Sequence, residues 1–102
     1  MDFKALASNL GIDEEDFMEL VELFVETTRS DIEKIKKSLL ESNAENAALA
    51  SHSIKGAAGN LGFEKIFELA RDMEQKARQG SLENFSEDVK QLEAGINFLD
   101  NV

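Results

Sequence analysis

Residues 51–62 read SHSIKGAAGNLG, and the rest of the chain is organised around this stretch. It holds the only histidine of the protein, His52, and three of its six glycines. The flanking sequence favours helix, where a glycine costs about 1 kcal/mol relative to alanine. These glycines therefore indicate a place where missing side chains serve a purpose.

The composition limits the possible kinds of protein. A chain of 102 residues can bury its own core, and we expect a single domain over residues 1–102. The absence of cysteine excludes disulfides and thiolate metal sites. A net charge of −10 argues against nucleic-acid binding. No apolar run approaches the ~20 residues of a membrane span, and no secretory signal is visible, so we expect a cytoplasmic domain without membrane contact.

The absence of proline and the spacing of the apolar residues at steps of three and four predict an all-α fold. Asp13, Ser42 and Ser81 are the predicted N-caps of the second, third and fifth helices. The predicted helices cover residues 3–10, 14–41, 43–60, 63–79 and 82–100. The connections between the four longer helices are short. We therefore expect an antiparallel up-down four-helix bundle, with the short N-terminal helix covering one end.

A projection of the third helix places His52 near the middle of its outward face. The opposite face is predicted to be buried and consists of Ala47, Ala50, Ile54, Ala57, Ala58 and Leu61. Gly56 and Gly59 follow His52 by four and seven residues and fall on its side of the helix. Because core packing cannot explain a glycine on the outward side, we expect both to clear room for a molecule that reaches the imidazole.

Apolar residues also lie beside His52 on the predicted outward face. Ala48 and Leu49, on the preceding turn, form an apolar fringe that is typical of a docking surface. We therefore expect Ala48, Leu49 and Gly59 to contact a partner. Lys55, three residues after His52, can bring its ammonium to a group attached to the ring.

One exposed imidazole has a limited chemistry. A neutral histidine is a nucleophile without a helper base, and it can accept a phosphoryl group and release it. A nearby cation would offset the charge on the phosphoryl oxygens. No glycine-rich phosphate loop and no nucleotide site are visible, and the sequence places no acid behind His52. A lone histidine with scattered carboxylates is a poor zinc site, so we expect no metal and no cofactor.

The run His52-Ser53-Ile54-Lys55-Gly56, followed by Ala57-Ala58-Gly59-Asn60-Leu61-Gly62, resembles the His-x-x-Lys-Gly motif of histidine-containing phosphotransfer (HPt) domains. The resemblance covers essentially the whole chain. It implies that His52 accepts a phosphoryl group through its outer ring nitrogen from a receiver-domain aspartate and passes it to another receiver. Lys55 then lies near the phosphoryl group, and Gly56 leaves room for the receiver.

The same resemblance implies the partners: receiver domains of response regulators or of hybrid sensor kinases. The receiver supplies the magnesium ion and the catalytic groups, so this protein is expected to be a carrier and not an enzyme, acting as a monomer. Three alternatives stay open. The domain is labelled by a chemotaxis-type histidine kinase, it is a non-catalytic helical interaction module, or His52 is the axial ligand of a bound haem.

Overall fold

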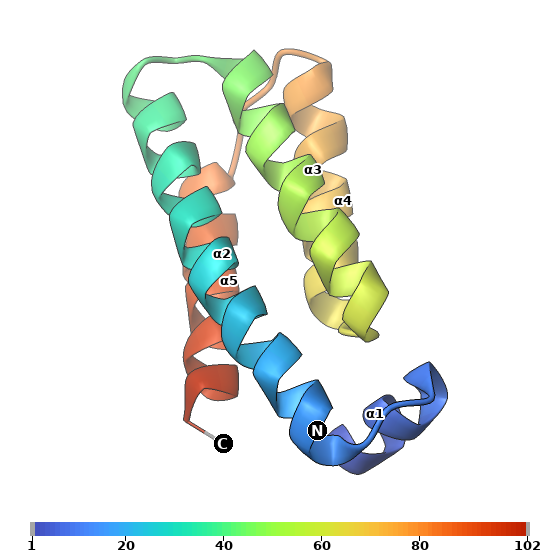
Figure 1. The fold of residues 1–102 in the computed structure, drawn as a ribbon. Helices are drawn as coiled ribbons and strands as arrows, with labels where there is room; N and C mark the ends of the chain where they lie inside the picture. Colours follow the sequence, from blue (N-terminus) through green and yellow to red (C-terminus); the bar gives the residue numbers. More distant parts are fainter. Residues whose placement is uncertain (1, 102) are drawn as a thin grey trace.

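The computed structural model describes residues 2–101, which form five helices (Figure 1). The bounds are α1 Phe3–Leu10, α2 Glu14–Leu40, α3 Ala44–Leu61, α4 Glu64–Arg78 and α5 Phe85–Asp100. Helices α2 to α5 alternate in direction, and α1 lies across the lower end of the bundle in Figure 1. This confirms the predicted all-α fold. Within the described residues, no helix combines the length and the apolar character that a membrane crossing requires.

Aromatic packing fixes the end of the bundle that α1 covers. Phe17 and Phe63 are buried, and their ring centroids lie 6.2 Å apart. Phe24 packs on Phe63 at 5.1 Å, and Phe3 of α1 packs on Phe17 at 5.9 Å. Such aromatic pairs add about 0.5–1.5 kcal/mol each to the burial of their apolar area. The first helix is therefore held by its own aromatic contact with α2.

Helix α3 packs between α2 and α4 and presents its remaining side to solvent (Figure 1). Ala47, Ile54 and Ala58 are completely buried, and Ala57 is half-buried, as the predicted core face requires. Small residues on this face let the neighbouring helices approach closely. The outward face of α3, which carries His52, is thereby fixed relative to α4.

The N-cap of α3 is Asn43, and the prediction of Ser42 is wrong by one residue. The side chain of Asn43 accepts a hydrogen bond of 3.0 Å from the backbone N–H of Asn46. Ser42 adopts a left-handed conformation with φ of 52°, which turns the chain between α2 and α3. Ser42 therefore lies one residue before the cap, and Asn43 supplies the capping side chain.

The fifth helix begins at Phe85 and not at residue 82, and Ser81 does not cap it. The hydroxyl of Ser81 accepts a hydrogen bond from the N–H of Glu83 at 3.2 Å, a local turn that competes with helix formation. Lys76 of α4 donates to the Glu83 carbonyl at 2.9 Å and to the Asp88 carboxylate at 2.7 Å. These two bonds tie the connecting segment to both helices.

Candidate functional site

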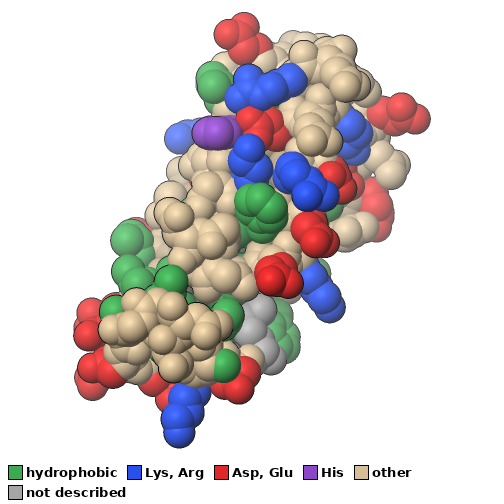
Figure 2. Space-filling view, turned by 90° about the vertical axis from the view of Figure 1, so that its right-hand side faces the viewer, with side chains coloured by type: hydrophobic (Ala, Val, Ile, Leu, Met, Phe, Trp, Pro, Cys, Tyr) green, Lys and Arg blue, Asp and Glu red, His purple; other side chains and the backbone are tan. Residues whose placement is uncertain are grey.

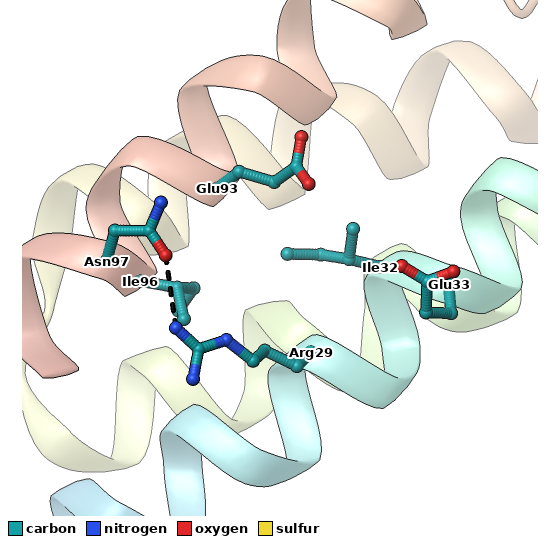
Figure 3. Close-up of a pocket in the computed structure, with 6 residues that line it drawn as sticks. All are labelled: Arg29, Ile32, Glu33, Glu93, Ile96 and Asn97. Atoms are coloured by element: carbon teal, nitrogen blue, oxygen red, sulfur yellow. Dashed lines mark hydrogen bonds between the residues drawn. The ribbon is translucent and has the colours of Figure 1, made fainter.

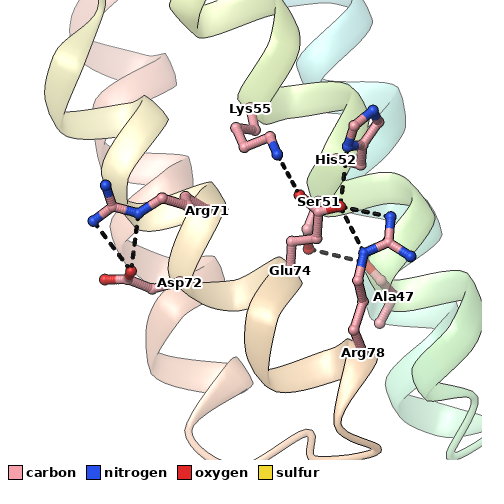
Figure 4. Close-up of polar contacts among 8 residues, drawn as sticks. All are labelled: Ala47, Ser51, His52, Lys55, Arg71, Asp72, Glu74 and Arg78. Atoms are coloured by element: carbon pink, nitrogen blue, oxygen red, sulfur yellow. Dashed lines mark hydrogen bonds and ion pairs between the residues drawn. The ribbon is translucent and has the colours of Figure 1, made fainter.

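The imidazole of His52 stands on the outward face of α3, and 59% of its side chain is exposed. Figure 2 shows it projecting from the surface beside several basic side chains. Its Nδ1 atom lies 3.0 Å from Oε2 of Glu74, which comes from α4 (Figure 4). One ring nitrogen is therefore engaged by the protein, while the ring as a whole remains accessible.

Glu74 is a buried carboxylate at the centre of this cluster, with only 7% of its side chain exposed. The Lys55 ammonium lies 2.7 Å from its Oε1, and the Arg78 guanidinium donates to Oε2 at 2.6 and 2.8 Å. Burial raises the pKa of Glu74, but the hydrogen bonds from Lys55 and Arg78 outweigh it and lower the pKa from 4.5 to about 2. The carboxylate is therefore ionised at neutral pH.

An ionised Glu74 determines which nitrogen of His52 carries the proton. A carboxylate only accepts hydrogen bonds, so the 3.0 Å contact requires a hydrogen on Nδ1. In a neutral imidazole the other nitrogen, Nε2, then bears the lone pair. Within the part of the chain that the structure describes, Nε2 has no hydrogen-bond partner. In the neutral ring, the nucleophilic atom therefore points away from the contact with Glu74.

Lys55 lies on the same side of α3 as His52, as the helical spacing predicts, and 26% of its side chain is exposed. Its ammonium is bound to Glu74, the carboxylate that also holds the imidazole (Figure 4). A cation thus stands beside the ring through a shared partner.

The two glycines on this side of α3 are not equivalent. A Cβ atom on Gly56 would meet nothing within 4 Å, so this position is open, and its role in access to His52 stays a prediction. A Cβ on Gly59 would lie 3.3 Å from the ring of Phe67 on α4. The absence of a side chain at Gly59 therefore accommodates Phe67, and the role of Gly59 in access to His52 stays a prediction.

The comparisons with known proteins agree on one family. The sequence model of the Hpt domain matches residues 19–101 of this chain. The chain belongs to the Hpt domain family. This Hpt domain is 36% identical, over 80 residues, to the phosphorelay intermediate protein YPD1 of Candida albicans. The alignment covers 76% of this chain and 44% of YPD1, so the chain spans less than half the length of that relative.

Among solved structures, the Hpt domain resembles the crystal structure of histidine-containing phosphotransfer protein B (HptB) from Pseudomonas aeruginosa PAO1. The TM-score is 0.83, and the match covers 97% of this chain and 86% of HptB. The sequence identity is 23%, so this likeness establishes the fold.

The predicted apolar fringe of the Hpt domain is only half present. Leu49 is 57% exposed, as expected. Ala48 is 2% exposed, so its prediction as an outward residue is wrong. Ala48 turns toward α4 and lines a hollow together with Ala77 and Arg78. The small side chains of Ala48 and Ala77 let α3 and α4 pack further around the outward face than a projection of one helix indicates.

Sequence reasoning missed Glu74 and Arg78. A signal was present, because the apolar stripe of the fourth helix runs through Ala70, Met73 and Ala77, and Glu74 falls within it. A buried carboxylate needs compensating donors, and Arg78 follows Glu74 by four residues on the same helix. Which residue of α3 meets this pair could not be read from the spacing within either helix.

A second hollow, of about 320 Å³, lies between α2 and α5 (Figure 3). Arg29 projects into it from α2 and donates a hydrogen bond of 3.0 Å to Asn97 of α5. None of the predicted site residues lines this hollow. Among residues 2–101, no group of three or more His, Asp or Glu side chains is arranged to hold a metal ion.

Proposed function

We propose that this Hpt domain carries a phosphoryl group between receiver domains, with His52 as the residue that is phosphorylated. The observation that supports this most strongly is the pairing of an exposed imidazole with a buried, ionised carboxylate. Glu74 keeps the proton on Nδ1, so Nε2 offers its lone pair to a phosphorus atom that approaches from solvent. Family membership and the likeness to a phosphorelay intermediate protein support the same reading.

The transfer step exchanges one bond for another. The lone pair of Nε2 attacks the phosphorus atom of an aspartyl phosphate, the bond from phosphorus to the aspartate oxygen breaks, and the aspartate leaves as a carboxylate. The phosphorylated ring is then cationic, with its proton still on Nδ1, and the negative charge of Glu74 stabilises it. When the carboxylate of a second receiver attacks the same phosphorus atom, the neutral ring returns.

Lys55 provides positive charge near the new phosphoryl group. Its ammonium is held by one carboxylate oxygen of Glu74, and Arg78 holds the other. If Lys55 turns toward the phosphoryl oxygens, Arg78 still compensates the charge of Glu74. We assign the magnesium ion and its ligands to the receiver, so that this domain acts as a carrier and the receiver as the catalyst.

The receiver reaches His52 over the side of α3 that faces α2. A Cβ atom on Gly56 would meet nothing within 4 Å, and Leu49 provides an exposed apolar contact one turn before His52. This role of Gly56 and Leu49 rests on their exposure next to the nucleophile. Gly59 lies further along α3, beside Phe67 of α4, and its contact with a partner remains part of the proposal.

A phosphotransfer screen tests the proposal. Purified receivers of the host are phosphorylated and mixed with the wild type and with His52→Gln, whose helix content is checked by circular dichroism. We expect one or more receivers to label the wild type, with an acid-labile and base-stable phosphate, and His52→Gln to take up none. Labelling of His52→Gln, or labelling of the wild type only by an isolated kinase domain with ATP, would contradict the assignment. Equal partner binding by both proteins without any labelling would favour a plain interaction module.

A further inference from the structure

The charges of this domain are unevenly distributed around His52. The chain has 21 acidic and 11 basic residues. Basic side chains nevertheless lie on α3 and on both helices that pack against it: Lys34 and Lys37 line a hollow between α2 and α3, Lys55 and Arg78 share Glu74 with His52, and Arg71 lies on α4. Figure 2 shows several Lys and Arg side chains near the histidine, with acidic side chains spread over the same face, including one beside the histidine.

The α2 side of His52 is a hollow of about 410 Å³ whose lining includes Lys34, Lys37, Leu49 and Ser53. Ser53 follows His52 directly, and Leu49 lies one turn before it, so the hollow adjoins the imidazole. The two lysines are weakly engaged. Lys34 lies 3.8 Å from the carboxylate of Asp31, and Lys37 forms no ion pair with any residue that the structure describes.

Two carboxylates also line this hollow, but they differ in availability. Asp31 is buried at its base, where the hydroxyl of Ser53 donates to it at 2.7 Å. Glu41 stands exposed at the far end, where α2 finishes. The ammonium groups of Lys34 and Lys37 therefore lie closer to solvent than Asp31 does, with 69% of the Lys34 side chain exposed.

Basic side chains also lie on the side of His52 that faces α4. Lys55 and Arg78 share the single carboxylate of Glu74. Arg71 contacts only its neighbour Asp72, through two bonds of 3.4 Å (Figure 4). Adjacent residues on a helix point about 100° apart, so this pair constrains Arg71 little.

Acidic residues dominate the outer surface of α2 beyond the His52 region. Its exposed carboxylates before residue 30 are Glu14, Glu15, Asp16, Glu19, Glu22 and Glu26. Several of them favour the helix start through the helix dipole, and none has a basic partner among the ion pairs of the described residues. An anionic partner is repelled by this part of the domain.

We propose that the lysines of the α2–α3 hollow, Lys34 and Lys37, steer the receiver onto His52 by attracting an anionic rim around its phosphorylated aspartate. This inference rests on the proposed function and specifies the chemistry of the partner surface. The acidic remainder of the domain repels the same rim. The receiver is therefore oriented with its phosphorylated aspartate toward His52 before the two proteins touch. Charge arrangements of this kind raise association rates about 10- to 1000-fold, and salt screens them over a Debye length of about 10 Å at 0.1 M.

The test compares two double charge reversals with the same change in net charge. Lys34→Glu/Lys37→Glu alters the hollow, whereas Lys4→Glu/Lys90→Glu alters exposed lysines on α1 and α5. Transfer from the phosphorylated receiver that labels the wild type is followed by rapid quench at several salt concentrations. We expect the second-order rate constant of the first variant to fall about tenfold or more at low salt and to approach the wild-type value at high salt. The control should stay within about twofold of the wild type, and the rate at saturating receiver should be unchanged in both.

Equal losses in the two double variants, or a loss that does not depend on salt, would overturn the inference. Lys37→Glu alone provides a second measurement, because it leaves the contact between Lys34 and Asp31 in place. If the wild type is labelled and Lys37→Glu transfers as fast as the wild type at low salt, the inference fails while the proposed function stands. If no receiver labels the wild type, the proposed function fails and the inference falls with it.

Discussion

The Nδ1 atom of His52 lies 3.0 Å from Oε2 of Glu74, although 22 residues separate them in the chain. This contact joins α3 to α4 and links an exposed side chain to a buried one. It sets the tautomer of the neutral imidazole, and the hydrogen bonds from Lys55 and Arg78 lower the pKa of the Glu74 carboxyl, which keeps it ionised.

Replacement of Glu74 by Gln should slow phosphoryl uptake about 10- to 100-fold. A glutamine amide both donates and accepts, so it no longer determines which nitrogen of His52 carries the proton. Nitrogen-15 NMR of the imidazole should show a single Nδ1–H tautomer in the wild type and a mixture in Glu74→Gln. An unchanged transfer rate in a variant with mixed tautomers would show that the contact is only structural.

Acid should destabilise the domain as Glu74 becomes protonated. The pKa of this carboxyl is lowered from 4.5 to about 2 in the folded chain, so the ionised form stabilises the fold above pH 4.5. That contribution, roughly 3 kcal/mol, should be lost as the pH falls from about 4.5 to about 2. Urea unfolding at a series of pH values measures it. Glu74→Gln should flatten the curve over this interval, and an equally steep curve in the variant would refute the assignment.

Gly56 and Gly59 should respond in opposite ways to alanine. Alanine at Gly56 meets open space and should raise the free energy of unfolding by about 0.5–1 kcal/mol through helix propensity. Alanine at Gly59 meets the ring of Phe67 at 3.3 Å, so it should gain less or lose stability. Urea midpoints of the two variants provide the comparison. Equal gains at both positions would contradict the packing described here.

A larger side chain at Gly56 should hinder the approach of a receiver to His52 without destabilising the fold. Gly56→Leu should reduce the transfer rate about tenfold or more, a loss of roughly 1.4 kcal/mol, because the leucine occupies space that the receiver needs. Its far-UV circular dichroism and its urea midpoint should remain close to those of Gly56→Ala. Collapse of the fold in Gly56→Leu, or normal transfer in a folded variant, would each show that the glycine serves another purpose.

Thr28 should be replaceable by valine with a gain in stability. Its hydroxyl oxygen is buried and has no hydrogen-bond partner, which costs about 1–3 kcal/mol. Valine has nearly the same shape and a similar helix propensity, so Thr28→Val should gain about 1 kcal/mol. Thr27→Val is the matched control, because the Thr27 hydroxyl is exposed and donates to the Leu23 carbonyl at 2.7 Å. Equal urea midpoints in the two variants would argue against the buried penalty.

The sequence predicts which site residues lie close together only where those residues belong to the same helix. His52, Lys55 and Gly56 lie on one helix, and its period alone places them on one side. Glu74 belongs to another helix, and the period of α4 shows that it is near the core but not which residue of α3 it meets. The misplacement of Ala48 has the same origin, because its burial depends on how closely α4 approaches.

The exact residues at which helices begin and end are also difficult to predict from the sequence. Glycines in the left-handed conformation, Gly11 and Gly62, end α1 and α3. The cap of α3 is shifted by one residue, and the start of α5 by three, because Asn43, Ser42 and Ser81 can each form several local hydrogen bonds of similar strength. Which of these hydrogen bonds forms depends on the path of the segments that connect the helices.

The open space at Gly56 affects the order in which receivers can bind this domain. Under the proposed function, donor and acceptor would both approach Nε2 of His52 across the open surface at Gly56, and we expect their binding to be mutually exclusive. Each exchange then requires one receiver to dissociate before the next arrives. An unphosphorylated donor in excess should therefore compete with the acceptor, and the relative abundance of the two receivers should govern how fast the signal moves forward.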